Sequence, residues 1–363
     1  MKYDTLIRQA LIIDGSNTPG YVADVGLRAG RIETIGDLSS ATGEHEVDAS
    51  GRVLAPGFID VHTHDDTVVI RHPQMLPKLS QGVTTVIVGN CGISASPVSL
   101  RSDPPDPMNL LGAREAFAYP RFADYRAAVE SAHPAVNVAA LIGHTALRSN
   151  HMDDLHRTAT PSEIAAMRVQ LQESLQAGAL GLSTGLAYAS AFNAETDEVL
   201  QLSEELTAFG AVYTTHLRSE FEPVLEAMDE AFVIGRHAQA PVIISHLKCA
   251  GAGNWGRSPQ LLASLELAAQ THPVGCDCYP YAASSSTLDL KQVTDAFRIT
   301  ITWSTPHPEV GGRDLQDIAA QWEVSLMDAA RRLQPAGAVY YGMDEADAVS
   351  YTHLRAHETK ANL

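Results

Sequence analysis

The chain has 363 residues, of which 45% are hydrophobic and 19% charged, a composition typical of a globular protein with a large core. Its formal net charge of −18 argues against nucleic acids or anionic membranes as partners, because their phosphates would repel it. No apolar run of about 18 residues predicts a membrane span, and no apolar signal segment follows Met1, so we expect a cytoplasmic protein.

Residues 1–54 contain short apolar runs separated by glycine, asparagine and aspartate. The runs at 6–7, 10–15, 22–27 and 30–36 are compact, as in strands that are joined by tight turns. We therefore expect residues 1–54 to form the N-terminal part of a small β-domain of the β-sandwich type.

From residue 55 onward, the pattern changes to an apolar run, a loop and an amphipathic helix, repeated in units of about 30 residues. Such continuous apolar runs are typical of parallel strands that are covered on both faces. Seven are present, at residues 53–61, 83–88, 137–142, 179–182, 211–213, 241–244 and 274–275. The repeat predicts an α/β protein with a (β/α)8 barrel, one strand of which is not accounted for. A doubly wound open sheet is the alternative, although no glycine-rich dinucleotide loop follows the first strand.

Three of the intervening helices have recognisable starts. The sequence TPSE at residues 160–163 combines a capping threonine, a first-turn proline and a capping-box glutamate, and it predicts a helix that ends at Gly178. Thr196 is expected to cap a second helix that ends near Gly210, and the Ser258-Pro259 pair begins a third.

Metal-ligand side chains follow most of the predicted strands. His62 and His64 come at the end of the first strand, where residues i and i+2 share a face. Cys91 follows the second strand, His216 the fifth and His246 the sixth. In a barrel the carboxyl ends of the strands meet at one face, so we expect these five side chains to form a metal site. Imidazole and thiolate donors favour zinc over magnesium or calcium.

Other polar residues lie at the same strand ends. Lys248 follows the sixth strand and could pair with an anionic substrate, or could remain a solvated charge. Arg218 and Glu220 follow the fifth strand and could orient a metal ligand, or could form a surface ion pair. His144, after the third strand, could support the ligands in the same way or could be a core residue.

These residues lie in motifs that resemble the amidohydrolase superfamily and, within it, the N-acyl-D-amino-acid deacylases (D-aminoacylases). The resemblance covers residues 1 to about 348. Its motifs are APGFIDVHTH (55–64), VGNCG (88–92), STGLAY (183–188), THLRSE (215–220), SHLK (245–248), DCYPY (277–281) and WSTPHPE (303–309). The cysteine is the more selective feature, because most relatives with two metals bridge them with a lysine or glutamate of the fourth strand. Here that strand reads LGLS (180–183) and has neither.

The resemblance implies a role for each matching metal ligand. Cys91, His216 and His246 match the ligands of a tightly held Zn2+. His62 and His64 match those of a second, weaker position, so one or two zinc ions are expected.

The resemblance also implies a reaction, the zinc-dependent hydrolysis of an N-acyl-D-amino acid to a carboxylate and a D-amino acid. Tyr188, Lys248 and Tyr279 match residues that hold the carboxylate or the carbonyl group of the substrate. The two tyrosines could instead serve only to pack their loops. Zinc would lower the pKa of water and polarise the acyl carbonyl, and Tyr188 would help to hold the oxyanion.

The chain departs from the family near its end. The family continues to an eighth strand with a proton-transferring aspartate in a Gly-Ser-Asp-type motif, and this sequence contains neither. Residues 349–363 resemble translated sequencing-adaptor read-through, and we expect them to be non-native. The barrel would then occupy residues 55–348, with an insertion at 289–345 that folds over the site. Because a barrel without its last strand has open edges, we expect low solubility and little or no deacylase activity.

Other functions remain open. One is a cyclic-amide hydrolase of the dihydroorotase or hydantoinase kind, against which Cys91 and the missing fourth-strand lysine argue. The other is a non-catalytic fragment that binds zinc. Lys291 and Arg298 in the insertion could favour acidic side chains on the substrate, or could be exposed charges. The sequence predicts a small-molecule substrate, no nucleic-acid or membrane partner, and no particular oligomeric state.

Overall fold

The computed structural model of the protein describes residues 1–358, with side chains up to residue 352. Residues 1–58 and 59–355 form two compact units. Among the described helices, none combines the length and the apolar character that crossing a bilayer requires.

The first unit is a small β-sheet, in agreement with the strands predicted for this segment. Its strands are β1 (Lys2–Ile12), β2 (Tyr21–Arg28), β3 (Arg31–Gly36), β4 (Thr42–Asp48) and β5 (Val53–Leu54). The order is β3-β2-β1-β4, and β5 also pairs with β1. Strand β1 is antiparallel to β2 but parallel to β4 and β5. Its buried side chains enter two apolar clusters, Tyr3 and Leu6 in one, and Ala10 and Ile12 in the other.

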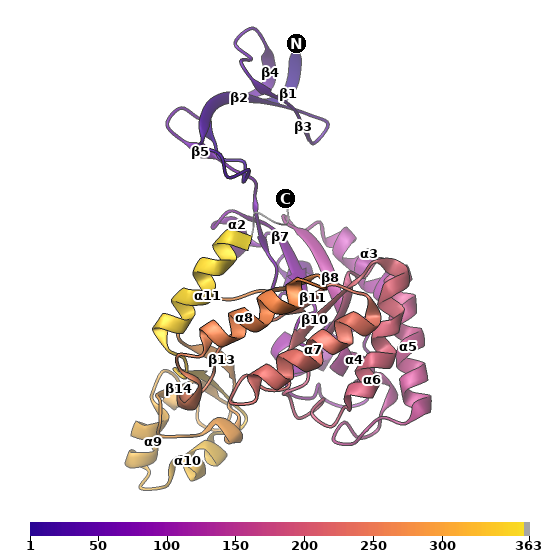
Figure 1. Ribbon diagram of the computed structural model, residues 1–363, viewed down its shortest axis with the longest axis vertical. Helices are drawn as coiled ribbons and strands as arrows, with labels where there is room; N and C mark the ends of the chain where they lie inside the picture. The colour runs from indigo at the N-terminus through magenta and orange to yellow at the C-terminus, as the bar shows by residue number, and fades with distance from the viewer. Residues whose placement is uncertain (359–363) are drawn as a thin grey trace. The chain divides into compact units, whose positions relative to one another are not determined.

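The second unit is built on a curled sheet of seven parallel strands, which confirms the predicted α/β class with an incomplete barrel (Figure 1). The strands are β6 (Phe58–Asp60), β7 (Val83–Val88), β8 (Asn137–Gly143), β9 (Gly181–Gly185), β10 (Val212–His216), β11 (Val242–Ile244) and β12 (Val274–Cys276). They lie side by side in chain order, from β6 at one edge to β12 at the other. A sheet in chain order with helical crossovers is the arrangement of a barrel and not of a doubly wound sheet.

The predicted first barrel strand, residues 53–61, is divided in the structure. Residues Val53–Leu54 form β5 and pair with β1, whereas Phe58–Asp60 form β6 in the seven-stranded sheet. The interruption is Ala55-Pro56-Gly57, where the proline has no N–H to donate to a ladder.

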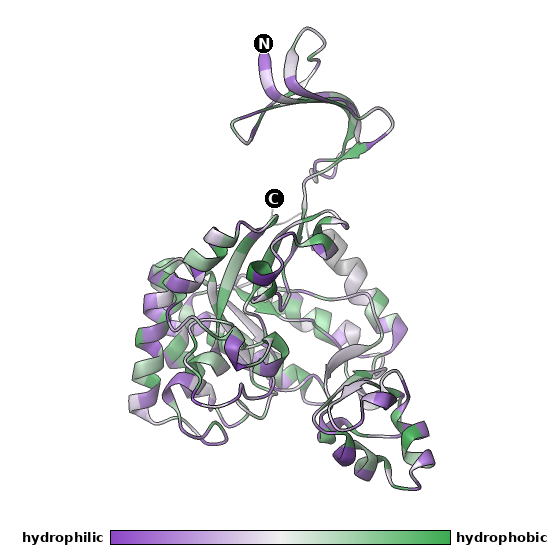
Figure 2. Ribbon diagram, turned by 180° about the vertical axis from the view of Figure 1, so that it is seen from behind, coloured by the Kyte–Doolittle hydropathy of each residue, from purple (hydrophilic) through white to green (hydrophobic). Residues whose placement is uncertain are grey.

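Helices connect the strands and cover the sheet. They are α1 (Val68–Arg71), α2 (Leu76–Leu79), α3 (Phe122–Ala132), α4 (His144–His151), α5 (Pro161–Gln176), α6 (Thr196–Ser203), α7 (Val224–Ala238) and α8 (Ser258–Ala269). Short 3₁₀ turns occupy Met108–Leu111, Arg114–Ala116, Glu204–Phe209, Ala252–Asn254, Leu290–Gln292 and Pro308–Val310. Helices α7 and α8 pack against β11 and β12 (Figure 1). Figure 2 shows apolar residues along strands of the central sheet; Val86, Val88, Ile142, Leu182, Val242 and Ile244 are buried in its core, whereas Phe58 and Ile59 of the edge strand β6 are exposed.

The predicted helix starts are largely confirmed. Thr160 and Glu163 form a capping box at the start of α5, and α8 begins at Ser258. Helix α6 differs from the expectation, because Thr196 is its first residue and Glu195 is the cap, without a side-chain cap hydrogen bond. The Thr196 hydroxyl donates instead to Glu230 at 2.7 Å, which ties α6 to α7.

A three-stranded antiparallel sheet is inserted after β12. Its strands are β13 (Ser284–Thr287), β14 (Ile299–Ser304) and β15 (Ala336–Tyr340), in the order β13-β15-β14, with helices α9 (Leu315–Gln321) and α10 (Leu326–Leu333) between β14 and β15. Ile301, Ile318 and Leu333 belong to the separate apolar core of this insertion. The sequence predicted an insertion at residues 289–345 but no sheet within it.

The last helix, α11 (Glu345–Glu358), returns to the core of the seven-stranded sheet, where Ala348 and Tyr351 are buried. Residues 349–358 thus continue this helix, and residues 359–363 lie outside the described part. The predicted domain limits and the predicted non-native tail at 349–363 remain predictions.

Replacing Thr160 by alanine tests the start of α5. Its hydroxyl accepts a hydrogen bond from Glu163 N at 3.3 Å, and the carboxylate of Glu163 accepts from Thr160 N at 2.7 Å. We expect Thr160→Ala to lower the free energy of unfolding by about 1 kcal/mol in urea denaturation, because a donor loses its partner. The control is Gln172→Ala at an exposed position of the same helix, expected to change it by less than about 0.5 kcal/mol. Equal losses in the two variants would contradict the capping role.

Candidate metal centre

The residues for which the sequence predicts a metal converge at the carboxyl ends of the parallel strands. Cys91, His216 and His246 offer ligand atoms that lie within 4.8 Å of one another. His62 and His64 form a second group of the same kind with Cys91, which both groups share. The Cys91 Sγ lies 3.1 Å from His62 Nε2 and 3.4 Å from His246 Nε2.

The loop that carries Cys91 is held on both sides of the cysteine. Asp66 is 1% exposed and accepts hydrogen bonds from the N–H groups of Gly89 and Ala95, at 3.3 and 3.1 Å. The φ of Cys91 is 55°, in the left-handed region that costs a residue with a side chain about 1–2 kcal/mol. A Cβ at Gly89 would lie 2.2 Å from Leu141 O, so only glycine fits there. The surrounding structure thus imposes a backbone conformation that presents the thiol to the histidines.

Asp277 orients two of the histidines. One of its oxygens lies 3.1 Å from His62 Nδ1, and it accepts the backbone N–H of His246 at 2.7 Å. His246 also has a left-handed φ, of 37°. A carboxylate on the second ring nitrogen fixes the ring and the tautomer of a metal-binding histidine. Asp277 is the first residue of the DCYPY motif (277–281), directly after the seventh predicted strand, and the sequence analysis assigns it no role.

The environment of Cys91 favours a thiolate. Burial alone would raise the pKa of Cys91, but His62 and His246 beside it hold the pKa well below its usual range. Burial opposes protonation of His62, yet the charges of Cys91 and Asp277 outweigh it and raise the pKa of this histidine. The negative charges of Cys91 and Asp277 and the positive charge of His62 therefore stabilise one another in the protein interior.

The donor chemistry of the two groups fits zinc. A thiolate with imidazole nitrogens is the ligand type that zinc prefers. His64 Nδ1 is buried and, among the described residues, has no hydrogen-bond partner, which is expected of an atom that faces a cation. Cys91, His216 and His246 could hold one ion, and His62 and His64 could hold a second through the shared thiolate.

Glu220, Lys248 and Tyr188 contact the outer nitrogen atoms of the histidines. Glu220 Oε1 lies 2.9 Å from His246 Nδ1 and 2.5 Å from Lys248 Nζ. The Tyr188 hydroxyl lies 3.2 Å from His216 Nδ1. Lys248 is only 4% exposed. Burial would raise the pKa of Glu220, but Lys248 and the neighbouring histidines hold it well below its usual range, so this carboxylate stays ionised beside the lysine.

These side chains open into a cavity of about 1100 Å³. Cys91, Lys248 and Tyr279 line it on the side of the barrel, and strand β13 and Tyr340 line it on the side of the insertion. The insertion therefore forms a wall of the candidate site. Lys291 also lines the cavity, whereas the Arg298 guanidinium stacks 3.6 Å above the ring of Tyr341.

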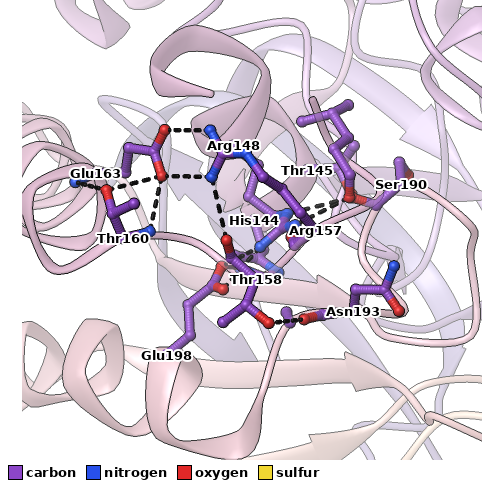
Figure 3. Close-up of polar contacts among 12 residues, drawn as sticks. His144, Thr145, Arg148, Arg157, Thr158, Thr160, Glu163, Ser190, Asn193 and Glu198 are labelled. Atoms are coloured by element: carbon purple, nitrogen blue, oxygen red, sulfur yellow. Dashed lines mark hydrogen bonds and ion pairs between the residues drawn. The ribbon is translucent and has the colours of Figure 1, made fainter. Parts of the chain in front are cut away.

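His144 and Arg218 have partners away from the metal ligands. The His144 Nε2 lies 2.8 Å from Glu198 Oε1, and Arg148 Nη1 lies 2.6 and 2.7 Å from the two oxygens of Glu198 (Figure 3). All three side chains are at most 1% exposed. Arg218 forms an ion pair with Glu230 at 2.7 Å. No sequence pattern indicates a role for Arg148 or Glu198, which lie on helices α4 and α6.

The chain is similar to known proteins in sequence and in fold. A sequence model described as an amidohydrolase family matches residues 45–361. A D-aminoacylase of Alcaligenes xylosoxydans xylosoxydans is 48% identical over 345 residues, which are 95% of this chain and 71% of the relative. A crystal structure of D-aminoacylase matches with a TM-score of 0.92 at 46% identity, over 95% of this chain and 73% of that one. The N-acyl-D-glutamate deacylase from Bordetella bronchiseptica, complexed with zinc and a phosphonate inhibitor, matches with a TM-score of 0.91 at 43% identity, over 96% and 73%.

Glu198→Gln tests the buried group around His144. Burial would raise the pKa of Glu198, but the hydrogen bond from His144 and the charge of Arg148 lower it from 4.5 to about 2. The carboxylate therefore stabilises the fold above pH 4.5, and this contribution is lost as the pH falls toward 2. At pH 7 we expect the substitution to lower the free energy of unfolding by about 3 kcal/mol, because Arg148 stays buried without a counter-charge.

The same comparison is repeated at several pH values. The difference in stability between the parent protein and Glu198→Gln should narrow between pH 5 and the acid limit of the folded state. A constant difference across that range would show that the charge of Glu198 is not what stabilises the fold.

Proposed function

The chain belongs to the amidohydrolase family, and we propose that it is a zinc-dependent deacylase that hydrolyses the amide bond of N-acyl-D-amino acids. The products are a carboxylate and a D-amino acid. One observation carries the proposal: a shared cysteine joins two histidine groups at the carboxyl ends of the strands, beside a buried lysine and a cavity. The similarity to D-aminoacylase over 95% of the chain supports the same reaction.

In this proposal, the cysteine and the four histidines bind zinc. Cys91, His216 and His246 would hold the more tightly bound zinc, and His62 and His64 the weaker one. Zinc, when bound, would lower the pKa of a water molecule and polarise the acyl carbonyl. Asp277 keeps the ring of His62 in a single orientation, since it lies 3.1 Å from the Nδ1 atom.

Lys248 would bind the substrate carboxylate. Its ammonium group lies in the cavity wall with Tyr279, whose ring centroid is 5.6 Å from the Lys248 Nζ. Among the described residues, the ammonium group contacts Glu220 and His246 Nδ1, so one of its three donors is left for a second anion. An α-carboxylate is the one charged group that every N-acyl-amino acid offers.

Tyr188 would donate a hydrogen bond to the oxyanion that forms at the acyl carbon. Burial raises the pKa of Tyr188 well above its ordinary value, so the phenol keeps its proton. The leaving amine needs a proton in the final step. In the family, an aspartate of a Gly-Ser-Asp-type motif delivers it; this sequence has no such motif, and we assign no residue to that step.

Two alternative functions have less support. A cyclic-amide hydrolase would be expected to carry the bridging lysine on the fourth strand, and β9 has the sequence GLSTG instead. Zinc binding alone would not explain the cavity beside the metal ligands or the buried lysine in its wall. A cytoplasmic location remains a prediction of the proposal.

Removing the shared cysteine tests the metal site. We expect Cys91→Ala to weaken zinc binding by about 100-fold or more, since both ligand groups lose their thiolate, and mutation of even outer contacts costs up to that much. Zinc affinity is measured by competition with a chromogenic chelator. Cys249→Ala, which replaces another buried cysteine, is the control and should keep the parent affinity. Equal affinity of Cys91→Ala and the parent would contradict the proposed ligand set.

Stereoselective, zinc-dependent binding tests the substrate class. Calorimetric titration of zinc-loaded protein with N-acetyl-D-methionine and its L enantiomer should give at least about tenfold tighter binding of the D form, a difference of about 1.4 kcal/mol. Removal of zinc with a chelator should abolish the preference. Release of the free D-amino acid, followed by a D-amino-acid oxidase assay, measures turnover in the same samples. Equal binding of both enantiomers, or opening of a hydantoin or dihydroorotate ring, would favour the alternatives.

A further inference from the structure

The loop between β9 and α6, residues 186–194, carries Tyr188 to the candidate site. The Tyr188 hydroxyl lies 3.2 Å from His216 Nδ1, and its ring centroid is 4.6 Å from that of His216. Phe192, farther along the loop, also lines the cavity, and Lys291 Nζ of the insertion lies 4.9 Å from its ring centroid. The position of Tyr188 therefore depends on the backbone of this loop.

Arg148 holds the middle of the loop from the protein interior. Its Nε donates to the carbonyl of Ser190 at 3.2 Å, and its Nη1 contacts both oxygens of Glu198. Its Nη2 donates to the carbonyls of Leu155 and Arg157, at 3.0 and 2.7 Å. One guanidinium thus joins the Tyr188 loop, helix α6 and the loop before α5 (Figure 3).

Arg218 holds the end of the loop in a similar way. Its Nη1 donates to the carbonyl of Phe192 and its Nη2 to that of Ala194, both at 3.0 Å. Glu230 neutralises it through contacts of 2.8 and 2.7 Å. Arg218 itself follows His216 by two residues, so it links the loop to the strand that carries the histidine.

We propose that Arg148 and Arg218 are positioning residues for Tyr188: they clamp the 186–194 loop through the carbonyls of Ser190, Phe192 and Ala194. Loops are in general more mobile than the elements that they connect, and a planar guanidinium fixes several acceptors in one geometry. The functional part of this inference rests on the proposed function, because that assigns the oxyanion to Tyr188.

Stability alone does not explain the geometry of these contacts. A buried ion pair is often no more stabilising than apolar side chains of similar volume, since both charges lose their hydration. Both arginines nevertheless direct donors to alternate carbonyls of one loop. The gain is a loop of defined shape, which a catalytic hydroxyl needs to remain within hydrogen-bond reach of its target.

A double-mutant cycle tests whether the clamp acts through Tyr188. The probe is the phosphonate analogue of N-acetyl-D-methionine, in which tetrahedral phosphorus replaces the acyl carbon, titrated calorimetrically into zinc-loaded protein. We expect Arg218→Lys and Tyr188→Phe each to weaken binding about tenfold, because each removes the same hydrogen bond. In the Tyr188→Phe background, Arg218→Lys should change the affinity by less than about twofold. Additive losses would overturn the inference.

Two further variants protect the test against misfolding. Arg126→Lys is the matched control, because Arg126 also joins a carboxylate, Glu130, to a loop carbonyl, that of Ala177, but away from the site. It should bind the probe as the parent does; an equal loss in this variant would count against the inference. If Arg218→Lys loses its thermal transition, Glu230→Gln replaces it in the cycle with the same expectation.

A second readout does not depend on the proposed function. In protein loaded with Co2+, Tyr188→Phe should shift the visible absorption bands, because the contact of the hydroxyl group with His216 Nδ1 is lost. Arg218→Lys should reproduce this shift, and Arg126→Lys should not. If the absorption spectrum of Arg218→Lys equals that of the parent protein, the proposed clamp is refuted. A zinc-loaded parent that fails to bind the phosphonate while the cobalt shifts appear would instead refute the proposed function and leave the clamp supported.

Discussion

The parallel direction of seven strands is the constraint on which the candidate site depends. Because every strand runs in the same direction, residues that follow different strands meet at the carboxyl ends of the strands. Cys91 and His246 lie 155 residues apart in the chain and 3.4 Å apart in space. Close packing at these ends then forces the local backbone: Ser183 of β9 accepts from Gly92 N at 3.1 Å and donates to Gly89 O at 2.5 Å, on either side of the left-handed Cys91.

Much of this arrangement could be predicted from the sequence, since apolar runs and their terminal residues are local signals. The seven strands lie close to the predicted positions, and the five candidate ligands are found together, because each follows an apolar run that forms a strand of the parallel sheet. The family resemblance added the expectation of a shared cysteine. The division of the first barrel strand was not predicted, because residues 53–61 are mostly apolar and were interpreted as one run. The interruption is at Pro56 and Gly57, which do not favour a continuous strand.

Partners that depend on tertiary distance could not be predicted. Glu198 lies on a helix whose pattern is ordinary, and only the fold brings it to His144 and Arg148. Asp277 was visible at a strand end, but its contact with His62 spans the sheet from one edge strand to the other. The insertion carries its own apolar core, and its short polar strand β13 has none of the hydrophobic alternation by which a half-buried strand is recognised.

The contact between Lys248 and Glu220 has a consequence for ligand binding. The lysine already holds a carboxylate, 2.5 Å away, before any ligand arrives. If Lys248 binds the α-carboxylate, as in the proposed function, that group would share or take over a donor that Glu220 occupies, and its affinity would reflect the difference between two similar interactions. On departure of the ligand, Glu220 would resume the contact, so the buried ammonium would keep a counter-charge throughout. Such an exchange would reduce the contribution of the α-carboxylate to binding equally for substrate and product, because both carry this group.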